Sequence, residues 1–207
     1  SDDTVLVMGE DVGVNGGVFR VTDGLYEKFG RKRVLDTPIA ESAILGAAIG
    51  MAMAGLKPVV EMQFSGFSYL MMHQLEGNAS RMRTRSRGQF TVPLVVRMPY
   101  GGGVRALEHH SESKEVYWAH TAGIKVVIPS SPANAGPLLT AAIQDPDPVV
   151  FMEPKRSYRS FKETIPANPD KIPIGKAMIL EQGNDITIIS WGAMMRDTLF
   201  AVKNLTK

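Results

Sequence analysis

The chain has 207 residues, of which 44% are hydrophobic and 21% are charged, and its net charge is +2. This composition excludes intrinsic disorder, which needs few hydrophobic residues and a high net charge, and the small charge argues against a general nucleic-acid-binding surface. Cysteine is absent, which excludes disulfides and cysteine-ligated metals and fits a reducing compartment. The longest largely apolar stretch, residues 42–56, is shorter than the ~20 residues that span a bilayer, so we expect no membrane association.

The order of apolar segments along the chain predicts the fold class. Continuous runs rich in valine and isoleucine are typical of strands buried on both faces of a parallel sheet, and they occur at residues 4–8, 59–62, 92–98, 124–128 and 149–152. Segments with the length and composition of helices lie at residues 41–56, 67–83 and 133–144. This alternation predicts an α/β domain with a doubly wound parallel sheet.

The sequence changes in character after Glu153. Prolines punctuate the polar stretch that follows, which predicts a linker over residues 154–184. Residues 185–190 then predict a new strand, and residues 196–205 a new helix. Because one strand and one helix cannot bury their own apolar faces, we interpret residues 1–153 as a whole domain and residues 185–207 as the start of a truncated α/β domain. The chain is then a fragment of a longer protein.

The segment before the first long helix contains a carboxylate with two interpretations. Thr37 is a suitable helix cap, and Pro38 suits the first helical position. Glu41 is then either a first-turn carboxylate favoured by the helix dipole or a carboxylate in an apolar setting. Burial would raise the pKa of such a carboxylate and let it share a proton with a ligand nitrogen. Gly46 and Gly50 in this helix indicate close approach of another backbone, either within the domain or from a partner subunit.

A glycine-rich loop and two histidines follow the strand predicted at residues 92–98. Loops at strand ends in open α/β folds often carry function, so a histidine in the pair His109 and His110 is an acid or base candidate. Adjacent histidines point in different directions on most backbones, which argues against a shared metal. The glycines at 101–103 match no phosphate-binding pattern, and we expect them to provide flexibility.

Two charged segments have both a structural and a functional interpretation. Arginines alternate with small or polar residues at positions 81, 83, 85 and 87, which indicates either a solvated basic helix end or a strip that meets phosphates. Asp145 and Asp147 lie in a turn before a strand. Their carboxylates could also hold a hard cation, which prefers oxygen ligands.

Six segments, taken together and in order, resemble the beta subunits of thiamine-diphosphate-dependent 2-oxo acid dehydrogenases, most of all the bacterial pyruvate type. They are VLVMGEDVG at 5–13, RVLDTPIAES at 33–42, VVEMQFSGF at 59–67, GGGVRALEHHSES at 101–113, GIKVVIPSSP at 123–132 and PVVFMEPKRSYRSF at 148–161. The resemblance covers nearly the whole chain. It implies a transketolase-like pyrimidine-binding domain, a linker and a C-terminal domain of which most is missing.

The resemblance also implies site residues by position. Glu41 matches the family's catalytic glutamate, which contacts the aminopyrimidine ring of thiamine diphosphate. Gln63 and Phe67 match positions that line the pyrimidine pocket. His110, rather than His109, matches an active-site histidine that handles protons or orients the substrate and the lipoyl group.

The same resemblance implies one cation site on this chain and a second on a partner chain. Asp145 and Asp147 match a site that usually holds potassium, although many relatives have asparagine in place of Asp147. The diphosphate-binding pattern, Gly-Asp-Gly followed later by asparagine, is absent, since Thr22-Asp23-Gly24 lacks the first glycine. We therefore expect Mg²⁺ and the diphosphate to be bound by a separate alpha subunit in an α₂β₂ heterotetramer. The isolated chain is expected to be inactive.

The expected function is that of a beta subunit in the oxidative decarboxylation of pyruvate. The acyl group would pass to lipoyl groups on a transacylase core in the bacterial cytoplasm, with no nucleic-acid partner. The nearest alternatives are dehydrogenases for branched-chain 2-oxo acids or acetoin, and residues 155–161 favour the pyruvate type. An alternative of another class is a non-catalytic interaction module that keeps the fold and binds no cofactor.

Overall fold

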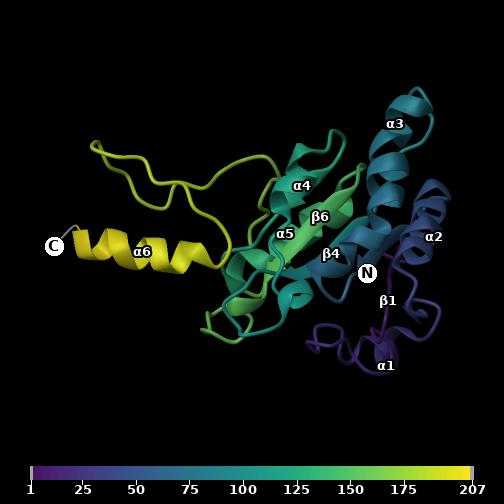
Figure 1. Ribbon diagram of the computed structural model, residues 1–207, viewed down its shortest axis with the longest axis horizontal. Coiled ribbons are helices and arrows are strands. Elements are labelled where there is room, and N and C mark those ends of the chain that lie inside the picture. Colours follow the sequence, from purple (N-terminus) through teal and green to yellow (C-terminus); the bar gives the residue numbers. More distant parts are fainter. Residues whose placement is uncertain (1, 206–207) are drawn as a thin grey trace.

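The computed structural model of the protein describes residues 2–205. A six-stranded sheet, parallel throughout and ordered β2-β1-β3-β4-β6-β5, forms its centre (Figure 1). The strands are β1 (Val5–Gly9), β2 (Val34–Asp36), β3 (Lys57–Glu61), β4 (Val95–Tyr100), β5 (Lys125–Val127) and β6 (Val149–Pro154). The predicted α/β class and parallel sheet are confirmed. The sequence did not predict β2, because its apolar run is only Val34 and Leu35, between the charged residues Arg33 and Asp36.

Helical segments connect successive strands and cover both faces of the sheet, whereas the C-terminal helix follows the last strand. The α-helices are α1 (Leu25–Phe29), α2 (Glu41–Met53), α3 (Met82–Arg85), α4 (Glu115–His120), α5 (Pro132–Gln144) and α6 (Met194–Leu205). The shorter 3₁₀ or π segments are η1 (Ser65–Met71), η2 (His73–Asn78), η3 (Ala79–Arg81), η4 (Glu108–His110) and η5 (Lys155–Ser157). The predictions of α2, α5 and α6 are confirmed within a few residues at each end.

The segment predicted as one helix over residues 67–83 is a succession of different helical turns. It passes from the 3₁₀ helix η1 through the π-helix η2 and the 3₁₀ turn η3 into the α-helix α3. Met71, Leu75 and Ala79 are all buried in the core along this segment. Tertiary packing therefore changes the local pitch of a segment whose composition alone suits a regular helix, and such π turns are frequent near functional sites.

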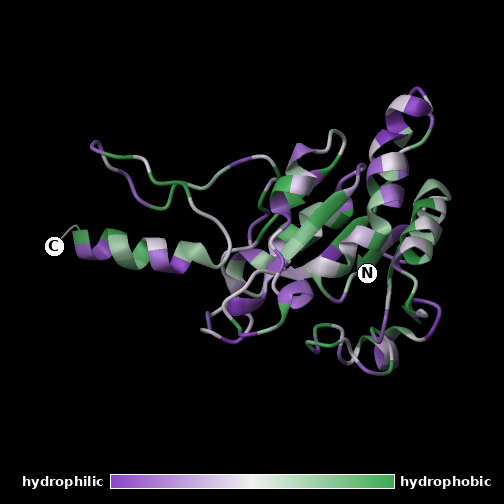
Figure 2. Cartoon of the chain, viewed as in Figure 1, coloured by the Kyte–Doolittle hydropathy of each residue, from purple (hydrophilic) through white to green (hydrophobic). Residues whose placement is uncertain are grey.

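Alternate residues along the strands face two separate hydrophobic layers. On one face, Val60, Val96 and Val150 pack with α2, the η1–η3 segment and Trp118 of α4. On the other face, neighbouring strand residues pack with Leu138, Leu139 and other side chains of α5. Figure 2 shows the hydrophobic strands enclosed between these helices. Because both faces of the sheet are covered, the strands have continuous apolar sequences rather than alternating ones.

Three central strands are also joined by a buried ionic network. Arg97 of β4 donates from Nε to Glu153 Oε1 of β6 at 2.7 Å, from Nη2 to Glu153 Oε2 at 2.9 Å, and from Nη1 to Glu61 Oε2 of β3 at 2.8 Å. Tyr158 donates to Glu153 Oε2 at 2.5 Å. All three charged side chains are buried, so their charges depend on one another for compensation. We call these residues the Arg97 network.

The predictions that Thr37 caps α2 and that Pro38 is its first helical residue are wrong, whereas the helix start predicted at Glu41 is confirmed. The helix begins at Glu41, and Ala40, not Thr37, precedes it as the cap residue. The backbone N–H of Thr37 donates to the Gly9 carbonyl at 3.0 Å, which continues the pairing of β2 with β1 by one residue. Thr37 and Pro38 therefore belong to the connection from β2, and this leaves Glu41 as the first helical residue.

The strand predicted over residues 185–190 is also wrong. Residues 162–193 contain no helix or strand. Residues 185–190 pair with none of the strands of the sheet, and a strand needs such a partner for its backbone N–H and C=O groups. This segment runs away from the sheet and returns at α6, which projects from the main body (Figure 1).

Candidate functional site

The predicted site residues lie in two groups at opposite edges of the sheet. Glu41 follows β2, Gln63 and Phe67 follow β3, and His110 lies in the connection after β4. In a parallel sheet the carboxyl ends of all strands meet at one edge, where ligands of open α/β folds bind. These four residues share that edge. The Asp145–Asp147 turn precedes β6 and therefore lies at the amino edge.

A pair of acidic side chains forms one part of the candidate site. Glu41 and Glu10 are both buried, with 6% and 7% of their surfaces exposed. Burial raises the pKa of Glu10, and the nearby charges of Glu41 and Asp11 raise it further. The Gln63 amide donates to Asp11 Oδ2 at 3.4 Å. The fold therefore places two buried carboxyl groups and an amide near one another, and the pKa of one of them, Glu10, is raised.

An aromatic cluster around His110 forms the second part. The imidazole ring of His110 lies 4.2 Å from the Phe64 ring and 5.6 Å from the Phe67 ring, between centroids and edge to face in both cases. Phe64 and Phe67 are themselves 5.9 Å apart. His109 stacks on Phe67 at 6.3 Å, so both histidine rings contact Phe67, one stacked and the other edge to face.

A cavity of about 350 Å³ opens beside this cluster. Phe67, His109 and His110 line it together with Gly66, Tyr69, Leu70, Leu107 and Glu108. Glu41 and Gln63 do not line it. The structure therefore brings Phe67 together with His110, and Glu41 together with Glu10, as two neighbouring parts of the same sheet edge.

Sequence reasoning missed three polar residues at this edge. Glu10 Oε1, Thr37 Oγ1 and Ser65 Oγ are buried, and none has a hydrogen-bond partner in the part of the chain that the structure describes. Each follows one of the neighbouring strands β1, β2 and β3 within a few residues, which is the signal that could have revealed them. Unpaired buried polar atoms at the same end of the sheet as the Phe67–His110 pocket fit a heterocycle that offers ring nitrogens and an amino group. The residues present therefore fit an aminopyrimidine.

Asp145 and Asp147 already have cationic partners. Lys125 Nζ lies 2.7 and 2.8 Å from the two carboxylate oxygens of Asp145, and Arg83 Nε lies 2.8 Å from Asp147 Oδ1. These carboxylate side chains do not fit a cation site, because their charge is already compensated. A potassium ion at this turn stays a prediction, and it would have to be held by backbone oxygens.

Two other sequence features have structural roles here. Thr22 donates to the Val12 carbonyl at 2.7 Å, and Gly24 precedes α1 with a positive φ of 78°, so residues 22–24 form a turn.

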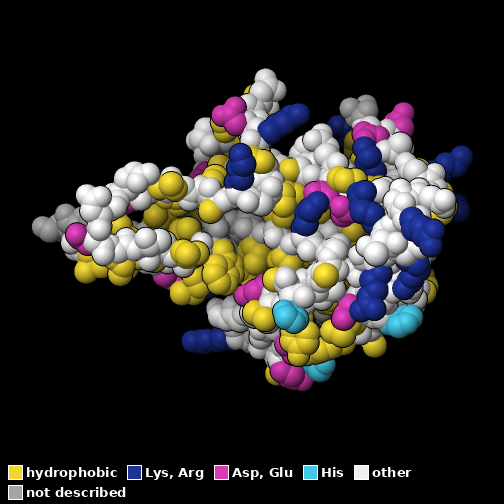
Figure 3. Space-filling view, turned by 90° about the horizontal axis from the view of Figure 1, so that it is seen from above, with side chains coloured by type: hydrophobic (Ala, Val, Ile, Leu, Met, Phe, Trp, Pro, Cys, Tyr) yellow, Lys and Arg dark blue, Asp and Glu magenta, His cyan; other side chains and the backbone are white. Residues whose placement is uncertain are grey.

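Among residues 2–205, no three His, Cys, Asp or Glu side chains gather as a metal site. Arg83 is held by Asp147, and Arg85 donates to the Gly77 carbonyl at 2.9 Å. Figure 3 shows basic side chains gathered at the end of the molecule that carries α3.

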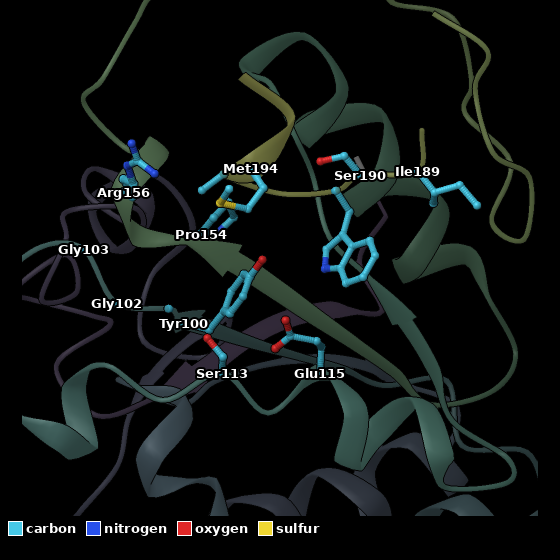
Figure 4. A pocket seen from close by; sticks show the side chains of 13 residues that line it. Tyr100, Gly102, Gly103, Ser113, Glu115, Pro154, Arg156, Ile189, Ser190 and Met194 are labelled. Atoms are coloured by element: carbon cyan, nitrogen blue, oxygen red, sulfur yellow. The ribbon is translucent and has the colours of Figure 1, made fainter. Parts of the chain in front are cut away.

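A second cavity, of about 470 Å³, lies between the glycine loop and residues 189–194. Figure 4 shows Tyr100, Ser113 and Glu115 on one side of it, and Arg156 with Met194 on the other. Burial and the Glu115 charge raise the pKa of Tyr100 to about 12. None of the predicted site residues lines this cavity.

The parallel sheet, with an acidic pair and an aromatic pocket at the carboxyl ends of its strands, defines an open α/β domain, a class whose ligands bind at that end of the sheet. Residues 1–160 match the model of the transketolase pyrimidine-binding domain, and the chain belongs to this family. The resemblance inferred from the sequence is confirmed at this level.

Comparison with individual curated proteins gives a more specific result than the family model. The chain is 58% identical over 202 residues to the pyruvate dehydrogenase E1 component subunit beta of Acholeplasma laidlawii, covering 98% of this chain and 62% of that protein. It is 52% identical to the subunit of the same name in Mycoplasma pneumoniae, covering 96% and 61%. The 2-oxoisovalerate dehydrogenase subunit beta of Bacillus subtilis is 48% identical, with 100% and 63% covered. The chain thus spans about three fifths of the length of these relatives.

A solved structure supports the fold. A chain described as split gene transketolase, inactive beta4 tetramer, matches with a TM-score of 0.72 over 99% of this chain and 62% of its own length, at 19% identity. At that identity the likeness concerns the fold alone. Within the described residues, no helix combines the length and the apolar character needed to cross a bilayer.

Proposed function

We propose that this chain supplies the pyrimidine-binding part of the active site in the beta subunit of a thiamine-diphosphate-dependent 2-oxo acid dehydrogenase. The substrate is pyruvate, and the acyl group passes to lipoyl groups of a transacylase core in the bacterial cytoplasm. The observation that carries the proposal is the buried Glu41–Glu10 pair at the carboxyl edge of the sheet. The identity to pyruvate dehydrogenase beta subunits supports the choice of substrate.

The residues of this chain would hold the cofactor's aminopyrimidine end. Thiamine diphosphate, when bound, supplies a nucleophilic carbon and an electron sink for the decarboxylation. Glu41 shares a proton with a ring nitrogen, and Glu10 keeps a second carboxyl close enough to replace that proton. Phe67 offers an apolar face to the ring, and Gln63 is held beside the acidic pair by Asp11. His110 presents its imidazole to the cavity, where it can move a proton at the substrate.

The alpha subunit would complete the site. This chain lacks the Gly-Asp-Gly pattern, so Mg²⁺ and the diphosphate would be held by the partner in an α₂β₂ heterotetramer. The α2 helix is the interface candidate, since its small residues Ala43, Ala47 and Gly50 are exposed. A helix that exposes small residues lets another backbone approach closely.

The central test replaces Glu41 in the full-length beta subunit assembled with its alpha subunit. Glu41→Gln is expected to lower the rate of pyruvate decarboxylation by about 10²–10⁴-fold, the usual contribution of a positioned acid or base. Glu27→Gln, which changes an exposed first-turn carboxylate of α1, is the control and should leave the rate unchanged. Full activity of Glu41→Gln would support a non-catalytic interaction module instead.

A second candidate is a branched-chain 2-oxo acid dehydrogenase. The 48% identity to the 2-oxoisovalerate dehydrogenase subunit supports this second candidate. The assembled enzyme should have a higher kcat/KM for pyruvate than for 2-oxoisovalerate, and acetoin serves as the third substrate. Preference for the branched acid would overturn the assignment of substrate while leaving the cofactor site intact.

A further inference from the structure

Two lysines are buried next to the candidate pocket without any ordinary partner. Lys114 exposes 1% of its surface and Lys155 exposes 7%. Across residues 2–205, neither Nζ atom has a hydrogen-bond acceptor, and neither lies within ion-pair distance of a carboxylate. An ammonium group taken out of water without compensation is costly. These two positions therefore need a physical explanation.

Both ammonium groups lie against aromatic rings of one segment. Lys114 Nζ lies over the ring of Tyr69 in η1, and Lys155 Nζ lies 5.3 Å from the centroid of the Phe64 ring, just before η1. A lysine ammonium within about 6 Å of a ring centroid is attracted to the negative face of the ring. Residues 64–69 are therefore held from two sides, by the residue preceding α4 and by the first residue of η5.

The segment held in this way carries the pocket. Phe67 lies on it, and Phe64 contacts the His110 ring at 4.2 Å. Lys114 itself ends the loop that bears His110, and this loop is closed at its base by the Gly101 N–H, which donates to the Glu112 carbonyl at 2.8 Å. The Lys114–Tyr69 contact thus joins the His110 loop to η1. The Lys155–Phe64 contact joins η1 to the end of β6.

We propose that Lys114 and Lys155 are positioning residues, whose cation–π contacts with Tyr69 and Phe64 fix His110 relative to Phe67. The proposal rests on the proposed function for its catalytic consequence. Its geometric part, the placement of His110, is independent of any activity. Neither lysine lines either cavity, which favours a role through the rings over direct binding of an anion.

The geometric part is tested by NMR of the histidine rings in the chain labelled with ¹³C and ¹⁵N. The chain has four histidines, so His73 and His120 report on general changes. Lys114→Met and Tyr69→Leu are expected to shift or broaden the His110 resonances, which feel the ring current of Phe64. Tyr69→Phe keeps the ring, and Lys114→Arg keeps the charge, so both should preserve the parent spectrum. Lys155→Met should shift His110 as Lys114→Met does.

An exposed cation–π pair elsewhere in the chain provides the matched control. Lys28 Nζ lies 5.4 Å from the Phe29 ring in α1, and Lys28→Met should leave His110 unchanged. Unchanged His110 resonances in Lys114→Met would overturn the proposal. The proposal would also be overturned if Tyr69→Phe and Tyr69→Leu changed the His110 resonances equally, because the hydroxyl group rather than the ring face would then matter.

The catalytic part is tested in the full-length beta subunit assembled with its alpha subunit. Lys114→Met and Lys155→Met should each lower kcat about 10-fold with KM for the 2-oxo acid nearly unchanged, and Lys114→Arg should restore kcat. A large rise in KM at constant kcat would instead identify the lysines as binding groups for the substrate carboxylate, and would overturn the proposal. If Glu41→Gln retains full activity while the NMR results hold, the proposed function fails and the positioning of His110 stands.

Discussion

At the scale of single residues, the candidate site depends on a carboxylate that the sequence did not single out. Glu41 follows β2 and Glu10 follows β1, and the fold buries both beside each other. Either residue alone has an ordinary interpretation, Glu41 as a first-turn carboxylate and Glu10 as a polar residue of a turn. Burial and the nearby Glu41 charge raise the pKa of Glu10, an effect that neither position shows in the sequence.

The Glu10 carboxyl should make stability depend on pH. Because burial and the charges of Glu41 and Asp11 raise the pKa of Glu10 above its ordinary value of 4.5, the folded chain keeps a proton that the unfolded chain has already released. The free energy of unfolding therefore falls as pH rises from about 4.5 through the raised pKa. Glu10→Gln should flatten this dependence and be more stable than the parent at neutral pH. Urea unfolding across this pH range, with Glu27→Gln as control, measures it; equal slopes in parent and variant would contradict the prediction.

Gly66 should tolerate no larger side chain. A Cβ at this position would overlap the backbone carbonyl of His109, so the constraint is the close approach of η4 to η1. Gly66→Ala should destabilise the chain by about 1–3 kcal/mol, as overpacking does. Gly50→Ala is the control, because no atom lies within 4 Å of the added methyl group, and it should stabilise α2 by roughly 0.5–1 kcal/mol. Denaturant unfolding compares the two; effects of the same sign would refute the close contact.

At the scale of elements, the Arg97 network joins β3, β4 and β6 near their carboxyl ends. Removal of Arg97 would leave Glu61 and Glu153 buried without their shared counter-charge. Arg97→Met is therefore expected to cost about 3–5 kcal/mol in the free energy of unfolding. Arg156→Met, which breaks the half-exposed pair with Asp197, should cost no more than about 1 kcal/mol. Urea unfolding of both variants checks the difference, and a small cost for Arg97→Met would show that the network adds little.

The elements also show where the local sequence pattern was sufficient to predict secondary structure. Most strands and the helices α2, α5 and α6 were predictable, because the strands are continuous apolar runs and the helices have the length and composition typical of helices. The cap residue of α2 was not, because the backbone N–H of Thr37 donates to the Gly9 carbonyl across the sheet and Thr37 lies outside the helix. The mixed helical turns of residues 65–85 follow from contacts with α2 and η4, which no local pattern contains.

At the scale of the whole molecule, the chain divides into a buried sheet and a weakly attached C-terminal segment. The side chains of β4 and β6 are buried throughout, whereas Ile179, Ile186 and Ile189 are 74%, 75% and 83% exposed. Amide hydrogen exchange should therefore be slowest in β1, β3, β4 and β6 and fast across residues 162–193, which contain no helix or strand. Exchange as slow in that segment as in β4 would show that it is packed more firmly than its contacts indicate.

The sequence by itself determined the fold class and the family and predicted four residues of the candidate site, because apolar runs and ordered motifs are local properties of the chain. Only the tertiary structure decided which residues meet. The order of the strands brings Glu10 close to Glu41 and places Lys114 and Lys155 against the rings of residues 64–69. It also places Asp145 and Asp147 at the opposite ends of the strands from the pocket. Contacts of this kind depend on strand order and packing between distant segments, which spacing along the chain does not encode.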